Sequence, residues 1–218
     1  MFTGLVETIG TIADVRRQGA NITLGILPAQ SDFEVAVGAS VAVDGVCLTM
    51  EHCSSNMLFF TAVYETLTRT TLAGAIRGKK VNLERALPAG GRFDGHMVLG
   101  HVDGIGTMVS DRSVGGGVMR AFRVPSELTE LMALKGSVAL DGVSLTIASV
   151  ERDTIIVSLI PHTLAGSTME YLKAGEPVNI ECDVIARYIR HLLDCRSAGQ
   201  TAAQRDENLL QVMKRSGF

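Results

Sequence analysis

The chain has 218 residues, and 20 Lys and Arg stand against 23 Asp and Glu, so its formal net charge is −3. This balance does not favour a nucleic-acid-binding protein, which would show a basic face. No stretch is long and apolar enough to span a membrane, and the first ten residues carry an acidic residue and no basic segment, unlike a signal peptide. We therefore expect a soluble, cytoplasmic protein that binds neither nucleic acid nor membrane.

The cysteines and histidines do not form a metal-binding pattern. The four cysteines include no CxxC pair, and the five histidines include no HxxxH or HExxH spacing. His96 and His101 stand five positions apart, which is neither helical nor strand spacing for two ligands on one face. Glycine-rich phosphate and dinucleotide loops are also missing. The sequence therefore predicts no metal site and contains no cofactor-binding motif.

In the first half of the chain, short β-rich runs dominate. Residues 22–26 alternate loosely, residues 40–50 form a run broken at Asp-Gly, and residues 57–64 are apolar or aromatic at strand length. One helix is predicted, over Leu67–Ile76 before Gly78.

The second half begins with the same kind of pattern and ends differently. A helix is predicted over Ser126–Leu134 with Ser126 as its N-cap, and a strand over residues 154–160. Towards the end, Ile185, Ile189, Leu192 and Leu193 recur at helical spacing, and a further helix is predicted over Leu209–Met213. This apolar stripe could dock on its own chain or form an oligomer seam, and spacing alone does not decide between them.

A tandem repeat is the strongest signal in the sequence. Val41–Met50 and Val138–Ile147 are identical at seven of ten positions and lie 97 positions apart. Near the start of each copy, Gly4–Thr11 matches Gly100–Thr107 at a distance of 96. One extra residue in the second copy reconciles the two distances, and we expect it in the loop 115–117. The chain is a tandem duplication.

Many short strands in two copies of about 90 residues predict closed barrels, because closure removes exposed strand edges. We predict an all-β fold of two tandem, homologous six-stranded Greek-key barrels followed by a C-terminal α-helix. The expected boundaries are 1–96 for the first barrel, 97–186 for the second and 187–218 for a helical tail that serves oligomerisation.

Several motifs agree in order and spacing with one known family. These are MFTGLVE at positions 1–7, DGVCLT at 44–49, DGVSLT at 141–146 and GHMVLGHVDG at 95–104. From residue 1 to about 186, the chain resembles the riboflavin synthases of the alpha-chain type.

The resemblance implies an enzyme of riboflavin biosynthesis. In this family, two molecules of 6,7-dimethyl-8-ribityllumazine exchange a four-carbon unit to give riboflavin and 5-amino-6-ribitylamino-pyrimidinedione. No metal or organic cofactor is needed. Each barrel binds one lumazine, and the active site, with two lumazines, forms between barrels of neighbouring chains in a homotrimer held by C-terminal helices. The resemblance also implies association with lumazine synthase.

The resemblance further implies which residues line the two lumazine pockets, with Phe2 and Thr3 reaching the interface between paired sites. The first pocket would be lined by Gly4, Leu5, Val6, Cys47, Leu48, Thr49, Thr61, Ala62, Val63, Tyr64, Glu65 and Thr66, and the second by Gly100, His101, Val102, Lys135, Ser144, Leu145, Thr146, Leu159, Ile160, Pro161, His162, Thr163 and Leu164.

Four residues carry expected catalytic roles. His101 is expected to transfer a proton or orient a water. Ser144 and Asp141 are expected to assist at the deprotonated or acceptor lumazine, and Cys47 to act as a transient nucleophile or a polar contact at C7.

Each role has a structural rival. Cys47 could be a small core residue, the Asp-Gly turn uses Asp structurally, and Lys135 could be a solvated cation at a helix end. His96 follows a glycine and could bond only to backbone, so it ranks below His101.

Two other functions deserve comparison with the enzyme. A lumazine- or flavin-binding protein of the same fold that lacks catalysis should have one degraded pocket, whereas both DGV[CS]LT motifs are intact here. A flavin-carrying reductase would add a nicotinamide-binding βαβ unit, for which no glycine fingerprint exists. The enzyme is the favoured interpretation.

Overall fold

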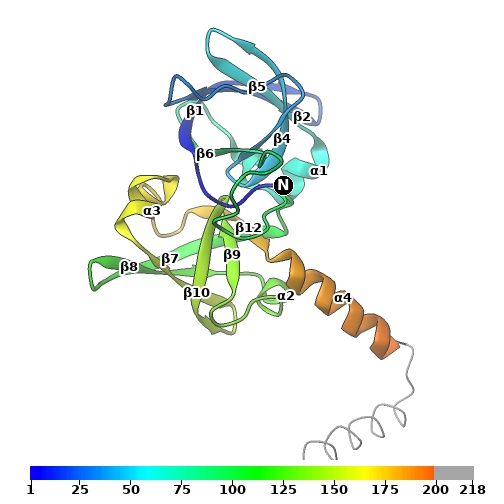
Figure 1. The fold of residues 1–218 in the computed structure, drawn as a ribbon, viewed down its shortest axis with the longest axis vertical. Helices are drawn as coiled ribbons and strands as arrows, with labels where there is room; N and C mark the ends of the chain where they lie inside the picture. The colour runs from blue at the N-terminus through cyan, green and yellow to red at the C-terminus, as the bar shows by residue number, and fades with distance from the viewer. Residues whose placement is uncertain (199–218) are drawn as a thin grey trace, which may run out of the picture. The chain divides into compact units, whose positions relative to one another are not determined.

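A computed structural model describes residues 1–198 of the chain (Figure 1). The chain divides into two compact units. The first, residues 1–184, contains both barrels, and the second begins at Ile185. Twelve strands in the described residues form two closed barrels of six antiparallel strands each, which confirms the predicted all-β fold.

The first barrel joins its strands in the order β1-β2-β5-β4-β3-β6, and β6 pairs with β1 to close it. The meander β3-β4-β5 is preceded by a long connection that places β2 beside β5, which is a Greek-key arrangement. The strands are β1 (Thr8–Gln18), β2 (Asn21–Pro28), β3 (Ser40–Val43), β4 (Val46–Ser54), β5 (Met57–Ala62) and β6 (Lys80–Arg85).

The second barrel repeats this order strand for strand and closes between β12 and β7. Its strands are β7 (Gly104–Val114), β8 (Gly117–Arg123), β9 (Ser137–Leu140), β10 (Val143–Glu151), β11 (Thr154–Leu159) and β12 (Pro177–Cys182).

The extra residue of the second copy does not lie in the loop 115–117, so that prediction was wrong. The β1–β2 and β7–β8 hairpins are the same length, with Gln18 opposite Asn21 and Val114 opposite Gly117. The distance between equivalent residues is still 96 at the end of β8 and becomes 97 at β9. The insertion therefore lies between β8 and β9, in the connection that carries α2 (Ser126–Thr129).

The short helices depart from the predicted boundaries. Instead of one helix over Leu67–Ile76, the chain forms α1 (Tyr64–Arg69) and the 3₁₀ turn η1 (Thr71–Gly74). Thr70 separates them in an extended conformation, and its hydroxyl accepts a hydrogen bond from Leu72 N–H. The N-cap of α2 is Pro125, not Ser126, and no side chain caps it.

The second barrel has the corresponding elements. They are α3 (Pro161–Ala165) and the 3₁₀ turn η2 (Thr168–Glu170).

Each barrel is filled by its own apolar core. Alternate side chains of every strand point inward, as the pleat requires, and the first core includes Leu24, Phe60 and Leu83, all fully buried. The second includes Phe122, Ile147 and Ile180 in the same state. Because both interiors are packed with side chains, a ligand must bind on the outer surface of the barrels.

Equivalent residues of the two copies meet where the barrels join. Phe2 and Val98, 96 positions apart, exchange two backbone hydrogen bonds of 2.7 and 3.2 Å. Asn82 Nδ2 donates to Asp141 O, and Asn179 Nδ2 donates to Asp44 O. Each contact and its copy are related by an approximate two-fold axis. We call the region where the two barrels meet the seam.

The second unit contains most of α4 (Val184–Ala198). This confirms the helix predicted from the spacing of Ile185, Ile189, Leu192 and Leu193, each of which is more than half exposed. The further helix predicted over Leu209–Met213 lies outside the described residues. No helix in the described part of the chain combines the length and apolarity needed to cross a bilayer.

Candidate functional site

Two extended arms precede the barrels, one before β1 and one before β7, and each arm lies against the barrel of the other repeat. The arm Gly4–Val6 precedes β1, yet Ser144 of β10 donates its N–H to Gly4 O at 2.7 Å, and Val6 packs on the second core. The arm Gly100–Val102 precedes β7, yet Cys47 N–H donates to Gly100 O at 2.9 Å, and Val102 packs on the first core. The two repeats thus exchange arms.

Glycine at the head of each arm permits this approach. A Cβ atom at Gly4 would lie 2.6 Å from Ser144 Cβ, and one at Gly100 would lie 2.5 Å from Cys47 Cβ. Both glycines also have φ of +77°, in the left-handed region that side chains disfavour. The close contact and the backbone conformation together require glycine at both positions.

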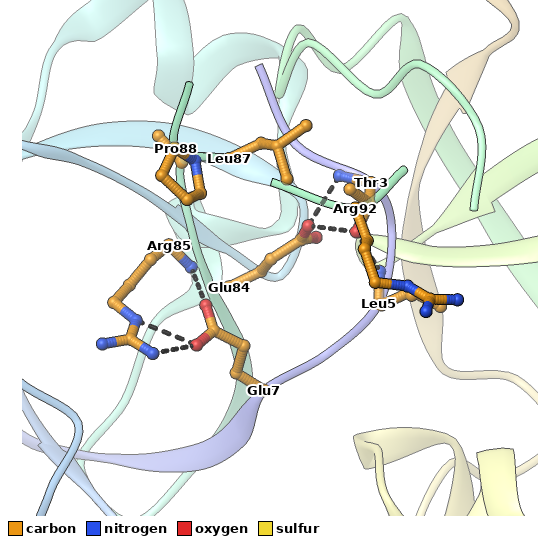
Figure 2. A pocket seen from close by; sticks show the side chains of 9 residues that line it. Thr3, Leu5, Glu7, Glu84, Arg85, Leu87, Pro88 and Arg92 are labelled. Atoms are coloured by element: carbon orange, nitrogen blue, oxygen red, sulfur yellow. Dashed lines mark hydrogen bonds and ion pairs between the residues drawn. The ribbon is translucent and has the colours of Figure 1, made fainter. Parts of the chain in front are cut away.

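A buried glutamate of each repeat fixes the arm of that repeat. Glu84 accepts hydrogen bonds from Thr3 N–H and Thr3 Oγ1 at 2.6 and 2.7 Å (Figure 2). It also accepts one from Gly4 N–H at 3.0 Å. Its counterpart Glu181 accepts from Leu99 and Gly100 N–H. Burial raises the pKa of Glu84, and the bonds from the arm act in the opposite direction.

The cavity beside Glu84 is about 480 Å³ (Figure 2). Glu7 and Arg85 form an ion pair at the edge of this cavity. Glu7 stands between the arm and the first residue of β1. Leu5 lines both this cavity and a cavity of the second barrel.

The exchange of arms corrects the predicted division of residues between the two pockets. Gly4, Leu5 and Val6 belong with the second barrel, and Gly100, His101 and Val102 with the first. The prediction drawn from the resemblance had assigned each arm to the barrel of its own repeat, whose first strand the arm directly precedes. We call the two regions the first site, on β4 and β5, and the second site, on β10 and β11.

The second site contains a cavity of about 220 Å³. Of the residues predicted for the lumazine pockets, it is lined by Gly4, Leu5, Val6, Ser144, His162 and Thr163; Val143, Gly166 and Ser167 also line it and were not predicted. Val143 lies within the DGVSLT motif, directly before Ser144, whereas Gly166 and Ser167 follow α3, so extending the predicted set through the turn after α3 would have found those two.

Several predicted lining side chains point into the barrels and cannot touch a ligand on the surface. Leu48, Ala62, Leu145 and Leu159 belong to the two cores and are almost completely buried. They alternate with outward residues along β4, β5, β10 and β11, so the pleat decides their direction.

Phe2 is also fully buried, in a cluster with Ala42, Val98 and Ala139 at the seam. It therefore lies inside the molecule rather than at an exposed interface between paired sites, contrary to the prediction. Thr3 is buried as well, with its hydroxyl on Glu84.

The outward residues of these strands fall at equivalent places in both sites. Cys47 and Ser144 are half-buried beside the arms, whereas Thr49 and Thr146 are exposed one pleat further along. Thr61 is half-buried, and its hydroxyl lies 3.2 Å from that of Thr23. These side chains offer a thiol and hydroxyls on one outer face of each barrel.

The rim of each site is apolar and exposed. Val63 and Ile160, which are equivalent, are 50% and 58% exposed, and Leu5 is 46% exposed. Tyr64, Glu65, Pro161 and His162 follow them in exposed positions, while Thr66, Thr163 and Leu164 are half-buried. Exposed apolar side chains around a shallow cavity are typical of a surface that a ligand or another protein covers.

His101 lies on the arm of the first site, between Gly100 and Val102, and its side chain is exposed. Its equivalent on the other arm is Leu5. An ionisable residue is therefore present on one arm only.

Asp141 lies away from the second site, although it was predicted to assist there. It lines a different cavity at the seam, together with Asp44. Its carboxylate accepts a 2.7 Å hydrogen bond from Asn179 N–H, as the Asp44 carboxylate does from Asn82 N–H. Both residues have positive φ in the Asp-Gly turn, so the turn uses each of them structurally.

Lys135 is exposed and occupies a left-handed turn, with φ of +64°. Its N–H donates to Ile147 O, and its counterpart Gly38 makes the equivalent bond to Met50 O. Lys135 and Gly38 thus stand at the same backbone position of the two repeats. The side chain of Lys135 is not among the residues that line the cavity of the second site.

His96 contacts the second site through its side chain, which the sequence did not reveal. Its N–H donates to Thr3 O, and its Nδ1 lies 2.7 Å from Ser144 Oγ. Burial lowers the pKa of His96, while the Asp183 carboxylate acts in the opposite direction. Cys47, the counterpart of Ser144, has no such imidazole beside it among the described residues.

Comparisons with known proteins point to one family. Residues 3–86 and 99–183 each match the lumazine binding domain. The chain is 39% identical over 201 residues to the riboflavin synthase of Bacillus subtilis (strain 168), covering 92% of this chain and 94% of the relative. It is 35% identical to that of Actinobacillus pleuropneumoniae over the whole of both chains, and 41% identical to that of Brucella abortus (strain 2308), covering 88% and 98%.

Among solved structures, the fold is similar to that of LumP. The crystal structure of LumP complexed with riboflavin has a TM-score of 0.78 and 24% identity, covering 84% of this chain and 99% of LumP. The complex of LumP with 6,7-dimethyl-8-(1'-D-ribityl) lumazine has a TM-score of 0.76 at 23% identity. At this identity, the likeness concerns the fold.

Proposed function

Because the chain belongs to the riboflavin synthase family, with two lumazine binding domains, we propose that it is the enzyme that dismutates 6,7-dimethyl-8-ribityllumazine. Two lumazines exchange a four-carbon unit and yield riboflavin and 5-amino-6-ribitylamino-pyrimidinedione. The observation that carries this proposal is that both outer-face sites keep the same frame: an arm glycine, a strand of the DGV[CS]LT motif and a threonine on the following helix.

The reaction suits a site built from arms and hydroxyls. The C7 methyl group of a lumazine is acidic because its anion delocalises into the ring, so the protein has to hold two rings together and move a proton. Holding both rings in a productive pose avoids an entropy loss that amounts to several kcal/mol. Thr49, Thr146 and the backbone groups of the arms are suited to bind the pyrimidinedione edge and the ribityl chain.

The residues that differ between the sites are the candidates for the chemistry. His101, on the arm of the first site, is proposed to transfer a proton or orient a water near a bound ring. Ser144, held by His96, is proposed to contact the ring in the second site. Cys47 is proposed as a polar contact at C7 in the first site. These differences let two identical lumazines become donor and acceptor.

A second chain is proposed to complete each site. The cavity at the second site, about 220 Å³, is smaller than the roughly 300–1,000 Å³ typical of ligand pockets. The exposed rim side chains Val63, Ile160 and Leu5 would be covered by a second chain, so that one lumazine site faces another. The exposed apolar stripe of α4 supports a homotrimer held by this helix.

Assembly can be tested by truncation after Ala186. The expected product is a folded but nearly inactive monomer, seen by sedimentation and by the rate of riboflavin formation. A fully active monomer would contradict assembly through the helix. Mixing with lumazine synthase on the same sedimentation instrument would test the expected association with that enzyme, and fractionation of cells would test the expected cytoplasmic location.

The activity is tested by incubating the purified protein with 6,7-dimethyl-8-ribityllumazine, a chelator and no added cofactor. Formation of one riboflavin per two lumazines consumed, followed by visible absorbance, supports the proposal. Tight binding with altered lumazine fluorescence but no riboflavin would show a lumazine-binding protein without catalysis. Turnover that disappears with the chelator would show that a metal takes part.

A further inference from the structure

A third cavity lies at the seam between the barrels, apart from the first and second sites. It has a volume of about 650 Å³, within the range of small-molecule pockets. Its polar lining comes from both repeats: Asp44, Thr71 and Lys79 from the first, and Asp141, Tyr171 and Glu176 from the second. Ile76, Leu172 and Pro177 add apolar wall.

The two buried aspartates of this cavity are equivalent, but only one has a lysine. Lys79 Nζ lies 3.6 Å from Asp44 Oδ2. The residue equivalent to Lys79 is Glu176, because Lys79 O accepts from Ile12 N–H and Glu176 O accepts from Met108 N–H at matching places of the two barrels. Glu176 turns back to its own turn and accepts a 2.8 Å hydrogen bond from Lys173 N–H. Asp141 therefore has no lysine from the equivalent position beside it, because that position is occupied by Glu176.

Two polar groups at this cavity also lack partners. The Asp141 side chain is more than nine-tenths buried, and within residues 1–198 its only hydrogen bond is the one from Asn179 to Oδ1, which leaves Oδ2 free. The Thr71 hydroxyl is buried and forms no hydrogen bond with the described residues. Buried polar groups in native proteins nearly always have a partner, so the buried Thr71 hydroxyl calls for one, and Asp141 Oδ2 can accept a further hydrogen bond.

The electrostatics favour a positive charge next to Asp141. Burial and the like charge of Asp44 both raise the pKa of Asp141 well above its ordinary value, and Lys79 opposes this only in part. The other charged groups of the lining are Lys80, whose ammonium lies 3.6 Å from the centre of the Tyr171 ring, and Glu176. If all were ionised, the three carboxylates would outnumber the two ammonium groups, which disfavours an anionic ligand.

We propose that the seam cavity is a binding site for a small primary alkylamine, whose ammonium group occupies beside Asp141 the place that Lys79 holds beside Asp44. The ammonium donates to Asp141 Oδ2, and a second N–H can reach the Thr71 hydroxyl. The alkyl body packs on Ile76, Leu172 and Pro177, as the stem of a lysine would. Because the amine bridges residues of both repeats, it stabilises the seam without entering the lumazine sites.

The first experiment uses n-butylamine, which reproduces a lysine side chain, with 1-butanol as its neutral counterpart. Titration calorimetry on the full chain is expected to show butylamine binding at one site per chain and no binding of butanol. Bound amine should also raise the midpoint of thermal unfolding, because it binds only the folded protein. Butanol binding as well as butylamine would overturn the requirement for a positive charge, and no butylamine binding would overturn the proposal.

The pH dependence distinguishes this site from weak attraction to surface carboxylates. An alkylamine stays protonated up to a pKa near 10, so below that pH the change in affinity reports the buried aspartates Asp141 and Asp44, since burial raises the pKa of both. Since the pKa of Asp141 is raised, affinity is expected to increase with pH in this range, and binding should release protons in buffers of different ionisation enthalpy. Affinity that does not change with pH would contradict the role of Asp141.

Two variants locate the site. Asp141→Asn keeps the turn and the bond from Asn179 but removes the charge, and should weaken butylamine binding at least about tenfold. Glu176→Lys places the chain's own ammonium beside Asp141 and should abolish binding while raising thermal stability. Glu151→Lys makes the same charge change at the exposed end of β10 and should bind like the unaltered protein. Equal weakening by Glu151→Lys and Glu176→Lys would show general charge attraction and overturn the proposal.

Discussion

The two barrels share one backbone and differ in what surrounds their sites. Strand order, closure and the arm glycines are the same in both. The first site has Cys47 and an arm with His101, whereas the second has Ser144 and an arm with Leu5. The segment that joins the barrels occurs once, and it brings His96 to Ser144 alone. Duplication therefore supplied two similar surfaces, and single-copy segments and point differences made them unequal.

The exchange of arms has a consequence for both barrels. Each site combines a strand surface of one repeat with an arm of the other, so neither repeat carries a whole site. A defect in the anchor of one arm should therefore appear at the site on the other barrel. Substitutions at the seam, at the arms and at the anchoring glutamates would each test this dependence.

Replacing Phe2 by Ala should have the largest effect. Phe2 is fully buried at the seam and pairs with Val98, and removing a buried aromatic side chain costs about 3–5 kcal/mol of stability. Because Phe2 also leads into the arm of the second site, we expect riboflavin formation to be lost in protein that still folds at low temperature. Phe33→Ala, a buried Phe of the first core alone, is the control and should lose stability but keep activity. Equal activity loss in both variants would contradict a special role of the seam.

Replacing His101 by Leu makes the first arm resemble the second. Loss of a proton-transferring side chain typically reduces a rate by about 10²–10⁴-fold, and we expect kcat to fall by at least tenfold with little change in thermal unfolding. His52→Leu, on the exposed end of β4, is the matched control. An unchanged kcat in His101→Leu would exclude this residue from proton transfer.

Replacing either anchoring glutamate by Gln tests the exchange of arms. Gln cannot accept all the hydrogen bonds that Glu84 receives, and leaving buried N–H groups unsatisfied costs about 1–3 kcal/mol each. Glu84→Gln should weaken ligand binding at the second site, and Glu181→Gln at the first, each by roughly tenfold. Chemical-shift mapping with a bound lumazine analogue measures both. The opposite assignment would show that each arm serves its own barrel.

The paired aspartates of the seam should differ in their response to pH. The pKa of Asp141 is raised by burial and by Asp44, so the folded protein holds this proton more tightly than the unfolded chain. Stability from this group is thus present at low pH and lost as pH rises through the raised pKa. Asp141→Asn should stabilise the protein at pH 7 but not at pH 4. Asp44→Asn should gain less stability at pH 7, because this substitution also removes the attraction between Asp44 and Lys79. Denaturant unfolding at both pH values measures this, and an equal gain in both variants would contradict the asymmetry.

Exchanging the residues beside the arms should have the smallest effect. Cys47→Ser and Ser144→Cys each keep a small polar side chain, so we expect kcat to change by less than about tenfold if both act as contacts. A loss of a hundredfold or more in Cys47→Ser alone would indicate that Cys47 is a nucleophile instead. The pH profile of Ser144→Cys adds a second readout, because His96 contacts only that position.

The duplication, the two barrels and many of the outward residues follow from patterns within the amino-acid sequence. Identity at seven of ten positions in Val41–Met50 and its copy establishes the repeat, and the β-rich runs with their Asp-Gly turns predict short antiparallel strands. The same alternation could have shown that Leu48 and Leu145 face the cores, because side chains of a strand alternate between its two faces. The extent of each strand and the alternation of its side chains follow local patterns, and local patterns are visible in a sequence.

Which arm lies against which barrel, and which polar groups meet, depend on contacts between residues far apart in the chain. His96 reaches Ser144 across 48 positions, and Asn179 reaches Asp44 across 135. The displacement of Asp141 into the seam cavity likewise follows from how one Asp-Gly turn packs against its copy. Such contacts carry no periodic signal, because they depend on how two finished barrels pack together rather than on the pattern of residues within either one.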